Sequence, residues 1–198
     1  MKVIGLTGPA GAGKSEAANI LARHGAYIID ADRIGHKLFE PQSDIWCKVL
    51  KAFGPQALMP GGKVNRHKLG EMVFSDPKKL RILNSITHPA IRRKIEEEIA
   101  EKNWRGKIVV VNSALPKLFE GLVDQTIVIT TLNPARLKRL IKKGLPRAAA
   151  IKMMNAQMPL KNYLKIADLV ISNDGTKKEL GEKLSLLLLN KTKESGLG

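Results

Sequence analysis

Eight residues near the amino terminus combine a lysine, a serine and glycines in a spacing that suits polyphosphate. Gly8–Ser15 reads Gly-Pro-Ala-Gly-Ala-Gly-Lys-Ser and fits the pattern G-x-x-x-x-G-K-[ST] at every fixed position. The glycines let backbone N–H groups turn inward onto phosphate oxygens, Lys14 reaches the transferable phosphate, and the Ser15 hydroxyl ligates Mg²⁺. The pattern therefore predicts a phosphate-binding loop.

The segments that flank this loop suit the same interpretation. Lys2–Thr7 is a short apolar run rich in β-forming residues, and Ser15–His24 carries apolar residues at helical spacing. A strand, a glycine loop and a helix in this order place the positive end of the helix dipole next to the bound anion. The alternative is a glycine-rich turn that fits the pattern by chance.

Two carboxylates, Asp30 and Asp32, directly follow the next strand-like run, Ala26–Ile29. In open parallel sheets, ligands bind beyond the carboxyl ends of the strands. We therefore expect one carboxylate to orient the proton of an attacking hydroxyl and the other to help hold Mg²⁺ through water. The alternative is that an aspartate only caps a helix.

Strand-like and helix-like segments alternate along the chain, which predicts a parallel sheet with crossover helices. Residues 33–105 form a long helical insertion, and residues 133–165 hold two further helical segments rich in cations, Ala135–Lys143 and Arg147–Gln157. A last helix begins at Thr176, because Thr176 and Glu179 have the spacing of a capping box. The five expected strands are Val3–Thr7, Ala26–Ile29, Lys107–Val111, Thr126–Thr130 and Leu169–Ser172.

Length and composition favour a single compact domain with lobes. The chain has 198 residues, 43% of them hydrophobic, which suffices for a substantial core. Cys47 is the only cysteine, so an intrachain disulfide is excluded. We find neither a signal peptide nor an apolar run long enough to span a bilayer, and we expect a cytoplasmic protein without membrane contact.

The net charge of +16 invites a nucleic-acid interpretation. Aromatic residues make up only 4% of the chain, no stacking module or zinc finger is evident, and the cations are spread along the sequence. An enzyme with two anionic substrates also gains from a positive field. We therefore expect no specific nucleic-acid partner, and keep a non-catalytic nucleic-acid-binding module as the distant alternative.

Several short motifs together resemble the dephospho-CoA kinases in order and spacing, over almost the whole chain. They are Gly8–Ser15, Ile28–Asp32, Gly62–Arg66 with Leu69, Val73 and Phe74, Leu83 and Asn84 with Thr87–Ile91, and Ala167–Ile171 with Asn173 and Gly175. The resemblance implies an α/β fold of the P-loop NTPase type, three-layered, with a five-stranded parallel sheet, a helical acceptor-binding lobe and a helical lid. It implies a single kinase domain over 1–198, with a core (about 1–32, 106–132 and 166–198), an acceptor lobe (about 33–105) and a lid (about 133–165).

The same resemblance implies that the γ-phosphoryl group of ATP is transferred to the ribose 3′-hydroxyl of dephospho-CoA, the last step of coenzyme A biosynthesis. Mg²⁺ is the implied cofactor, held by Ser15, and the enzyme is expected to be a monomer or weak homo-oligomer. The implied catalytic residues are Lys14, Asp32 as the base, and Arg139 from the lid. The implied nucleotide-binding residues are Gly11, Ala12, Gly13, Lys14, Ser15, Glu16 and Asn173, the last near the adenine.

Asp30, Asp32, Arg66 and His88 are the implied acceptor-binding residues. Two of them have simpler alternatives. Arg66 can lie over a helix with its guanidinium in solvent. His88 and Pro89 can start a helix after a turn, with Thr87 as the cap.

The chain departs from the family pattern in two places. Lys143 stands where a second lid arginine is usual, which loses a bidentate donor unless Arg147 supplies it. Residues 111–115 contain no acidic residue at the end of the third strand, and Glu120 fits a related motif only with a shifted register. The nearer functional alternative is another P-loop small-metabolite kinase, such as a nucleoside monophosphate, shikimate or gluconate kinase.

Overall fold

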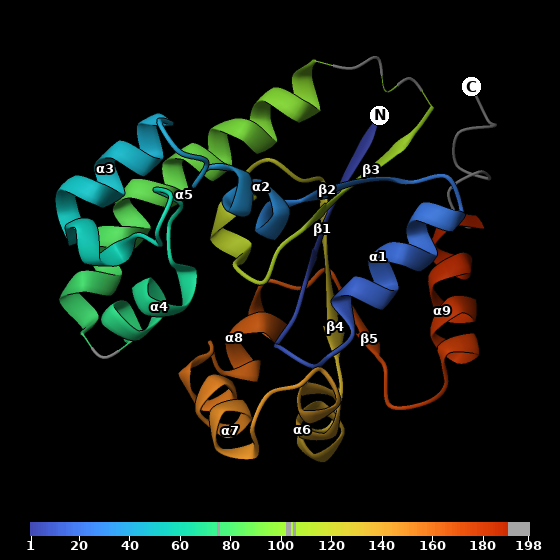
Figure 1. The fold of residues 1–198 in the computed structure, drawn as a ribbon. Helices are drawn as coiled ribbons and strands as arrows, with labels where there is room; N and C mark the ends of the chain where they lie inside the picture. The colour runs from blue at the N-terminus through green and yellow to red at the C-terminus, as the bar shows by residue number, and fades with distance from the viewer. Residues whose placement is uncertain (75, 102–103, 105, 190–198) are drawn as a thin grey trace. The chain divides into compact units, whose positions relative to one another are not determined.

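The computed structural model describes residues 1–74, 76–101, 104 and 106–189 (Figure 1). The chain forms two compact units. Unit 1 comprises Met1–Ile29 and Asn103–Gly198, and unit 2 comprises Asp30–Lys102.

Unit 1 is built on a five-stranded sheet in the order β2-β3-β1-β4-β5. β1 pairs in parallel with both β3 and β4, and β4 pairs in parallel with β5. The predicted parallel sheet is confirmed, with strand bounds within two residues of those expected. The strands are β1 (Lys2–Thr7), β2 (Tyr27–Asp30), β3 (Ile108–Asn112), β4 (Gln125–Thr130) and β5 (Leu169–Ser172).

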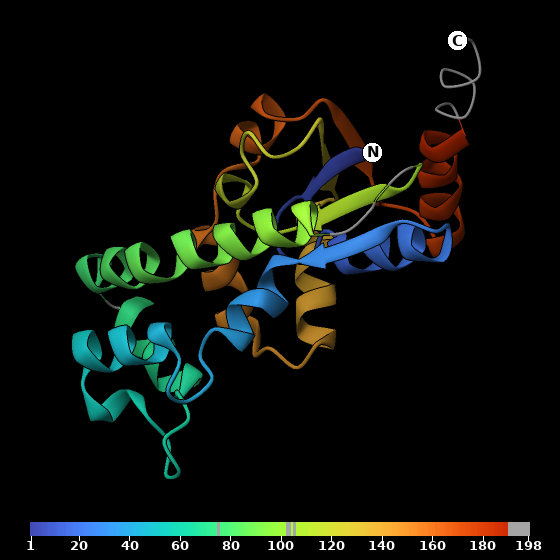
Figure 2. The ribbon, with the colours of Figure 1, turned by 90° about the horizontal axis from the view of Figure 1, so that it is seen from above.

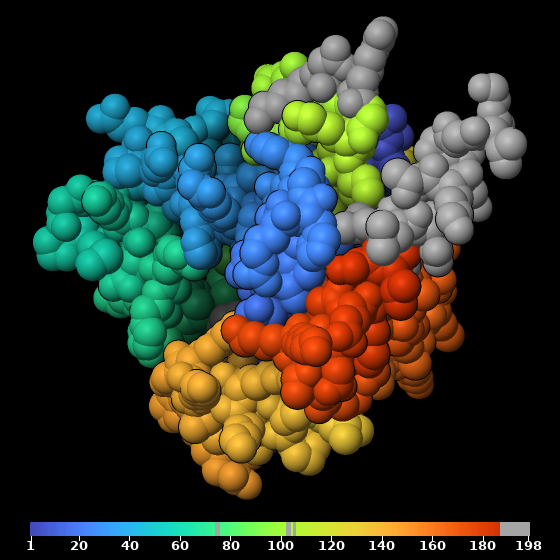
Figure 3. Space-filling model, turned by 90° about the vertical axis from the view of Figure 1, so that its right-hand side faces the viewer, coloured from blue at the N-terminus to red at the C-terminus, as the bar shows by residue number. Residues whose placement is uncertain are grey.

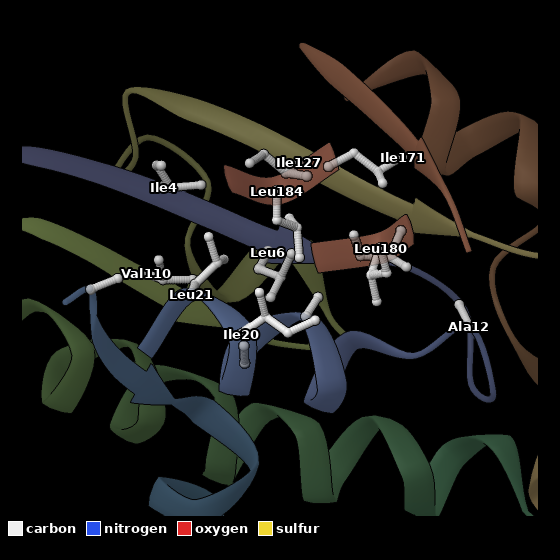
Figure 4. Packing of buried hydrophobic residues seen from close by; sticks show 14 residues of the cluster. Ile4, Leu6, Ala12, Ile20, Leu21, Val110, Ile127, Ile171, Leu180 and Leu184 are labelled. Atoms are coloured by element: carbon white, nitrogen blue, oxygen red, sulfur yellow. The ribbon is translucent and has the colours of Figure 1, made fainter. Parts of the chain in front are cut away.

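Two helices of unit 1 pack over one face of this sheet, α1 (Lys14–Arg23) and α9 (Lys177–Leu189). They lie side by side, α1 in blue and α9 in red in Figure 3. Their apolar side chains meet those of the central strands in the core shown in Figure 4, where burial of aliphatic surface supplies the main stabilising term. Labelled core residues are Ile4, Leu6, Ile20, Leu21, Val110, Ile127, Ile171, Leu180 and Leu184.

Thr176 caps the start of α9, as predicted, with one of the two hydrogen bonds of a capping box. The Thr176 hydroxyl accepts a hydrogen bond from the Glu179 N–H at 3.2 Å and donates to the Glu179 carboxylate at 3.0 Å. Further along unit 1, three helices follow β4 at its carboxyl end (Figure 1): α6 (Asn133–Lys142), α7 (Arg147–Ala156) and α8 (Leu160–Lys165). The first two match the predicted lid segments, and α8 is additional.

Unit 2 is helical. It contains α2 (Ala31–Lys37), α3 (Asp44–Phe53), α4 (Arg66–Phe74) and α5 (Pro77–Ala100), with a 3₁₀ turn at Pro55–Ala57 between α3 and α4; the other 3₁₀ turn, Pro116–Leu118, follows β3 in unit 1. The apolar face of α3, formed by Ile45, Val49 and Phe53, is buried in a cluster of its own. Residue 105, the expected end of the lobe, lies outside the described residues.

The alternative in which His88 and Pro89 start a helix, with Thr87 as its cap, is wrong. α5 runs without a break from Pro77 to Ala100 (Figure 2), its cap is Asp76, and Pro89 lies inside it. Proline in a helix interior removes one backbone N–H donor, and the rest of the helix tolerates that loss. The Thr87 hydroxyl donates to the Leu83 carbonyl at 2.9 Å within the same helix, so it is not a cap.

Candidate active site

The phosphate-binding loop lies between the last residue of β1, Thr7, and the first residue of α1, Lys14. Gly13 caps α1 with a φ of 106°, and Gly11 has a φ of 78°, a region that favours glycine. Space is also restricted: a Cβ at Gly11 would lie 2.7 Å from the Arg136 carbonyl oxygen, and one at Gly13 would collide with the Asn173 amide. The glycines therefore permit both the turn and the close approach of neighbouring elements.

Lys14 and Ser15 occupy the first turn of α1. The Lys14 ammonium donates to the Gly8 carbonyl at 2.7 Å, which places it across the loop that it closes. Ser15 is exposed at the amino end of the helix, where backbone dipoles favour an anion. The next residue, Glu16, uses its carboxylate in ion pairs with Lys177 at 3.0 Å and Arg23 at 4.0 Å.

Arg139, on α6, contacts the loop directly. Its Nη1 donates to the carbonyl oxygens of Gly11 at 3.3 Å and Ala12 at 3.1 Å, and its Nη2 donates to the Asn173 carbonyl at 2.8 Å. The lid arginine predicted from the sequence is thus brought to the loop.

Asn173 follows β5 and is buried. Its side-chain amide donates to the Ala12 carbonyl at 2.7 Å, and its own carbonyl accepts from Thr131 and Arg139. The structure therefore unites Lys14, Arg139 and Asn173 around one loop, although they are far apart in the sequence.

Sequence reasoning missed the next residue, Asp174. Its carboxylate accepts hydrogen bonds from the Ser172 hydroxyl, the Thr131 hydroxyl and the Leu132 N–H. These bonds, in that order of importance, lower the pKa of Asp174 to about 2, and the positive charge of Arg139 acts in the same direction. Asp174 thereby ties the end of β5 to the segment between β4 and α6.

Sequence reasoning missed two more residues, Arg136 on α6 and Gln157 at the end of α7, which contact the loop at Ala10. The only signal for Arg136 was its place in the cation-rich helix. Nothing local marks Gln157, since its partner lies 147 residues away.

In unit 2, Asp30 and Asp32 have different local roles. Asp30 ends β2 and caps α2, because its carboxylate accepts from the Arg33 N–H at 2.9 Å. Asp32 is exposed in the first turn of the same helix. The capping alternative is thus correct for Asp30, and the cap fixes the start of the helix that carries Asp32.

Arg66 lies beside a residue that sequence reasoning missed, His36. A guanidinium nitrogen of Arg66 is within hydrogen-bond distance of the His36 Nε2. His36 follows Asp32 by four residues on α2, so the two lie on the same side of that helix. This four-residue spacing was the sequence signal that could have identified His36. His88 is half-buried in the middle of α5.

Two positions depart from the family pattern. At the first, β3 ends with Asn112, an amide, which is buried beside Leu6 of β1. Glu120 is exposed. Lys143 ends α6 and Arg147 begins α7, both exposed.

The residues around the loop fit a hydrated Mg²⁺. This ion keeps several waters and takes few protein ligands in phosphate sites, so one exposed hydroxyl such as Ser15 is a suitable donor. The buried Thr7 hydroxyl has no hydrogen-bond partner among the described residues, and ordered water in such a hydration shell would satisfy it. In the same part of the chain, no group of three or more His, Cys, Asp or Glu side chains is placed to bind a metal directly.

As for the bilayer, none of the described helices has the length and apolar character needed to cross one.

Comparison with known families finds the same family along nearly the whole chain. The family model for dephospho-CoA kinase matches residues 2–179. The dephospho-CoA kinase of Carboxydothermus hydrogenoformans is 39% identical over 193 residues, which cover 95% of this chain and 93% of that protein. The enzyme of the same name from Thermobifida fusca is 37% identical over 190 residues, covering 93% of this chain and 94% of the relative.

Solved structures agree. The dephospho-CoA kinase from Campylobacter jejuni superposes with a TM-score of 0.71 at 28% identity, over 98% of this chain and all of that one (100%). The TT1252 protein from Thermus thermophilus gives 0.81 at 29% identity, over 96% and 97% of the two chains. A shikimate kinase from Acinetobacter baumannii, with 0.55 at 17% identity over 96% and 94%, shares the fold alone. The expected P-loop kinase fold is confirmed.

Proposed function

The chain belongs to the dephospho-CoA kinase family, and from this premise we propose how its residues carry the reaction. The enzyme phosphorylates dephospho-CoA to coenzyme A, the final step of coenzyme A biosynthesis, with ATP as the phosphoryl donor. The observation that carries the proposal is the loop Gly8–Ser15, whose outward carbonyls are held by Arg139 and Asn173.

We propose that the loop and Lys14 bind the β- and γ-phosphates, as the glycine geometry and the helix dipole of α1 favour. Glu16 contributes through its backbone in the first turn, because its carboxylate is engaged by Lys177. Ser15 would hold Mg²⁺, which neutralises charge on the phosphates when bound. Asn173 supports the nucleotide by fixing Ala12, and the predicted contact with the adenine stays a prediction.

For the acceptor, we propose that unit 2 supplies the binding lobe and that Asp32 accepts the proton of the ribose 3′-hydroxyl. Its exposed carboxylate can reach a substrate hydroxyl, and general bases of this kind typically contribute 10²–10⁴-fold. Asp30 positions Asp32 by capping α2. Arg66, with His36 beside it, and His88 would contact the phosphates or ribose of the acceptor.

In-line transfer requires little covalent work from the protein, which orients the reactants and offsets developing charge. We propose that residues 133–165 act as the lid and that Arg139 contributes positive charge from it. Three further expectations stay predictions: the core at about 1–32, 106–132 and 166–198, the cytoplasmic location, and the monomeric or weakly oligomeric state. Cell fractionation would check the location, and size-exclusion chromatography would check the oligomeric state.

Lys14→Ala tests the assignment of the loop. We expect phosphoryl transfer to be lost while thermal unfolding changes little, because loss of the hydrogen bond from Lys14 to the Gly8 carbonyl costs only about 1 kcal/mol. Lys138→Ala on α6, an exposed lysine, serves as the control and should transfer phosphate at the normal rate. A Lys14→Ala protein that fails to fold would assign a structural role to the loop instead.

A further inference from the structure

Ala10 is held through both of its backbone groups by side chains from the lid helices. Its N–H donates to the Gln157 Oε1 at 2.8 Å, and its carbonyl accepts from the Arg136 Nε at 2.9 Å. The two side chains also bond to each other, since Arg136 Nη2 donates to the same Gln157 oxygen at 3.0 Å. Asn133 accepts from the third nitrogen, Nη1, at 2.9 Å.

These contacts come from the start of α6 and the end of α7. Arg136 lies in the first turn of α6, and Gln157 caps the carboxyl end of α7. The start of α6 and the end of α7, here called the stems of the lid, therefore meet at one residue of the phosphate-binding loop. Between these two contacts lies the tip where α6 meets α7, around Gly144, whose φ of 92° turns the chain.

Holding a carbonyl also sets the direction of an N–H. In a planar trans peptide the C=O and N–H groups point in opposite directions. Arg136 binds the Ala10 carbonyl, so the N–H of the following residue, Gly11, is directed away from the lid helix. In the same way, Gln157 occupies the Ala10 N–H and removes it from the donors available to a phosphate.

Arg136 as a whole residue is 8% exposed, and no acidic side chain among the described residues forms an ion pair with its guanidinium. Burial lowers the pKa of Arg136, while the nearby Tyr163 has a smaller opposing effect. Arginine nevertheless stays charged in proteins. A buried positive charge beside the loop, satisfied by neutral oxygens, favours the arrival of an anion.

We propose that Arg136 and Gln157 are positioning residues that clasp Ala10, fix the direction of the Gly11 N–H and couple nucleotide affinity to the stems of the lid. This inference rests on the proposed role of the loop in binding ATP. It assigns lid movement to the α6–α7 tip, with the stems staying attached to the loop.

The test is the dissociation constant of ATP, measured by calorimetry for the wild type, Arg136→Gln, Arg136→Lys, Gln157→Ala and the Arg136→Gln/Gln157→Ala double variant. We expect Arg136→Gln to weaken binding by about 10-fold or more, as for loss of a charge-assisted hydrogen bond. Arg136→Lys should recover part of that loss, because it keeps the charge without the planar fork. The double variant should lose less than the product of the single effects, since both side chains act on Ala10.

Lys138→Gln is the matched control: it removes one positive charge from the exposed face of the same helix. An ATP affinity of Arg136→Gln within twofold of this control, or independent effects of the two substitutions, would overturn the proposal. If Arg136→Gln does not fold, Gln157→Ala and Arg136→Lys decide in the same way, because Gln157 is partly exposed. The binding is measured with ATP alone, so an absence of transfer to dephospho-CoA would count against the proposed function and not against the clasp.

Discussion

At the scale of single residues, the loop binds phosphate through its peptide planes, so whatever holds a carbonyl decides where the next N–H points. Asn173 and Arg139 both donate to the Ala12 carbonyl, and this directs the Gly13 N–H to the opposite side. Some of the side chains that orient the N–H groups of the loop therefore lie outside the motif Gly8–Ser15.

In the proposed mechanism, Asp32 is the residue on which the chemistry depends most. We expect Asp32→Asn to lower kcat by about 10²–10⁴-fold, because an amide cannot accept the proton of the ribose hydroxyl. The fold should stay intact, since the cap of α2 is provided by Asp30 and not by Asp32. Initial rates at saturating ATP and dephospho-CoA, with circular dichroism of both proteins, give the answer.

Asp44→Asn provides the comparison for Asp32→Asn. Asp44 is also an exposed carboxylate in the first turn of a unit 2 helix, and its substitution should leave kcat unchanged. Equal turnover by wild type and Asp32→Asn would remove Asp32 from the chemistry.

Asp174 predicts a pH dependence of stability. Its pKa of about 2 in the folded protein is below the value near 3.9 of an unperturbed aspartate. The charged form therefore stabilises the fold above about pH 4, and this contribution is lost as the pH falls toward about 2. Urea unfolding of Asp174→Asn should show a deficit against wild type that is largest above pH 4 and shrinks below it. A deficit that is constant from pH 7 to pH 2 would contradict this account.

The place of a residue in the fold could be predicted where the signal is local, and was missed where the partners are distant. Lys14 and Ser15 could be placed at the end of the loop because the motif fixes their spacing within eight residues; their roles stay predictions. Gln157 and Asp174 were not, because they bond to backbone groups that only the folded chain brings near. His36 had a usable signal in its four-residue spacing from Asp32.

At the scale of elements, the strands were predictable because each is a short β-branched run bounded by turn residues. For α5, the alternative of a helix start at Pro89 is wrong, although proline usually starts or ends a helix. Burial of Ile91 and Ile95 on one face stabilises this helix despite the backbone hydrogen bond that is lost at Pro89. Tertiary packing overrode the local preference.

The Thr176 cap of α9 can be tested by substitution, at the scale of elements. Thr176→Ala removes the acceptor of the Glu179 N–H, and we expect a loss of about 1 kcal/mol in the free energy of unfolding. Thr176→Ser keeps the hydroxyl and should retain most of the stability. Chemical denaturation of both variants measures the difference, and equal stabilities of Thr176→Ala and Thr176→Ser would show that the cap does not contribute.

At the scale of the whole molecule, basic residues occur along the entire chain, but one segment has no acidic residues to balance them. Residues 133–165 contain nine Lys and Arg and no Asp or Glu, out of a net charge of +16. Since ATP and the acceptor are both anionic, this segment should attract them at long range.

The charge predicts a salt dependence. Between 0.05 and 0.5 M KCl we expect the KM for ATP to rise roughly 3- to 10-fold, with kcat little changed, because salt screens exposed charges. A variant with Lys142, Lys152 and Lys161 replaced by Gln should show a shallower rise, as all three are exposed. Parallel slopes for the two proteins would mean that these lysines do not act on the substrate.

The most direct measurement is ATP consumption with and without dephospho-CoA, across a panel that also offers a nucleoside monophosphate, shikimate and gluconate, with each product identified by mass. The account predicts that only dephospho-CoA accelerates consumption, and that the product has the mass of coenzyme A. Equal or faster phosphorylation of another acceptor, or no product from dephospho-CoA, would contradict it.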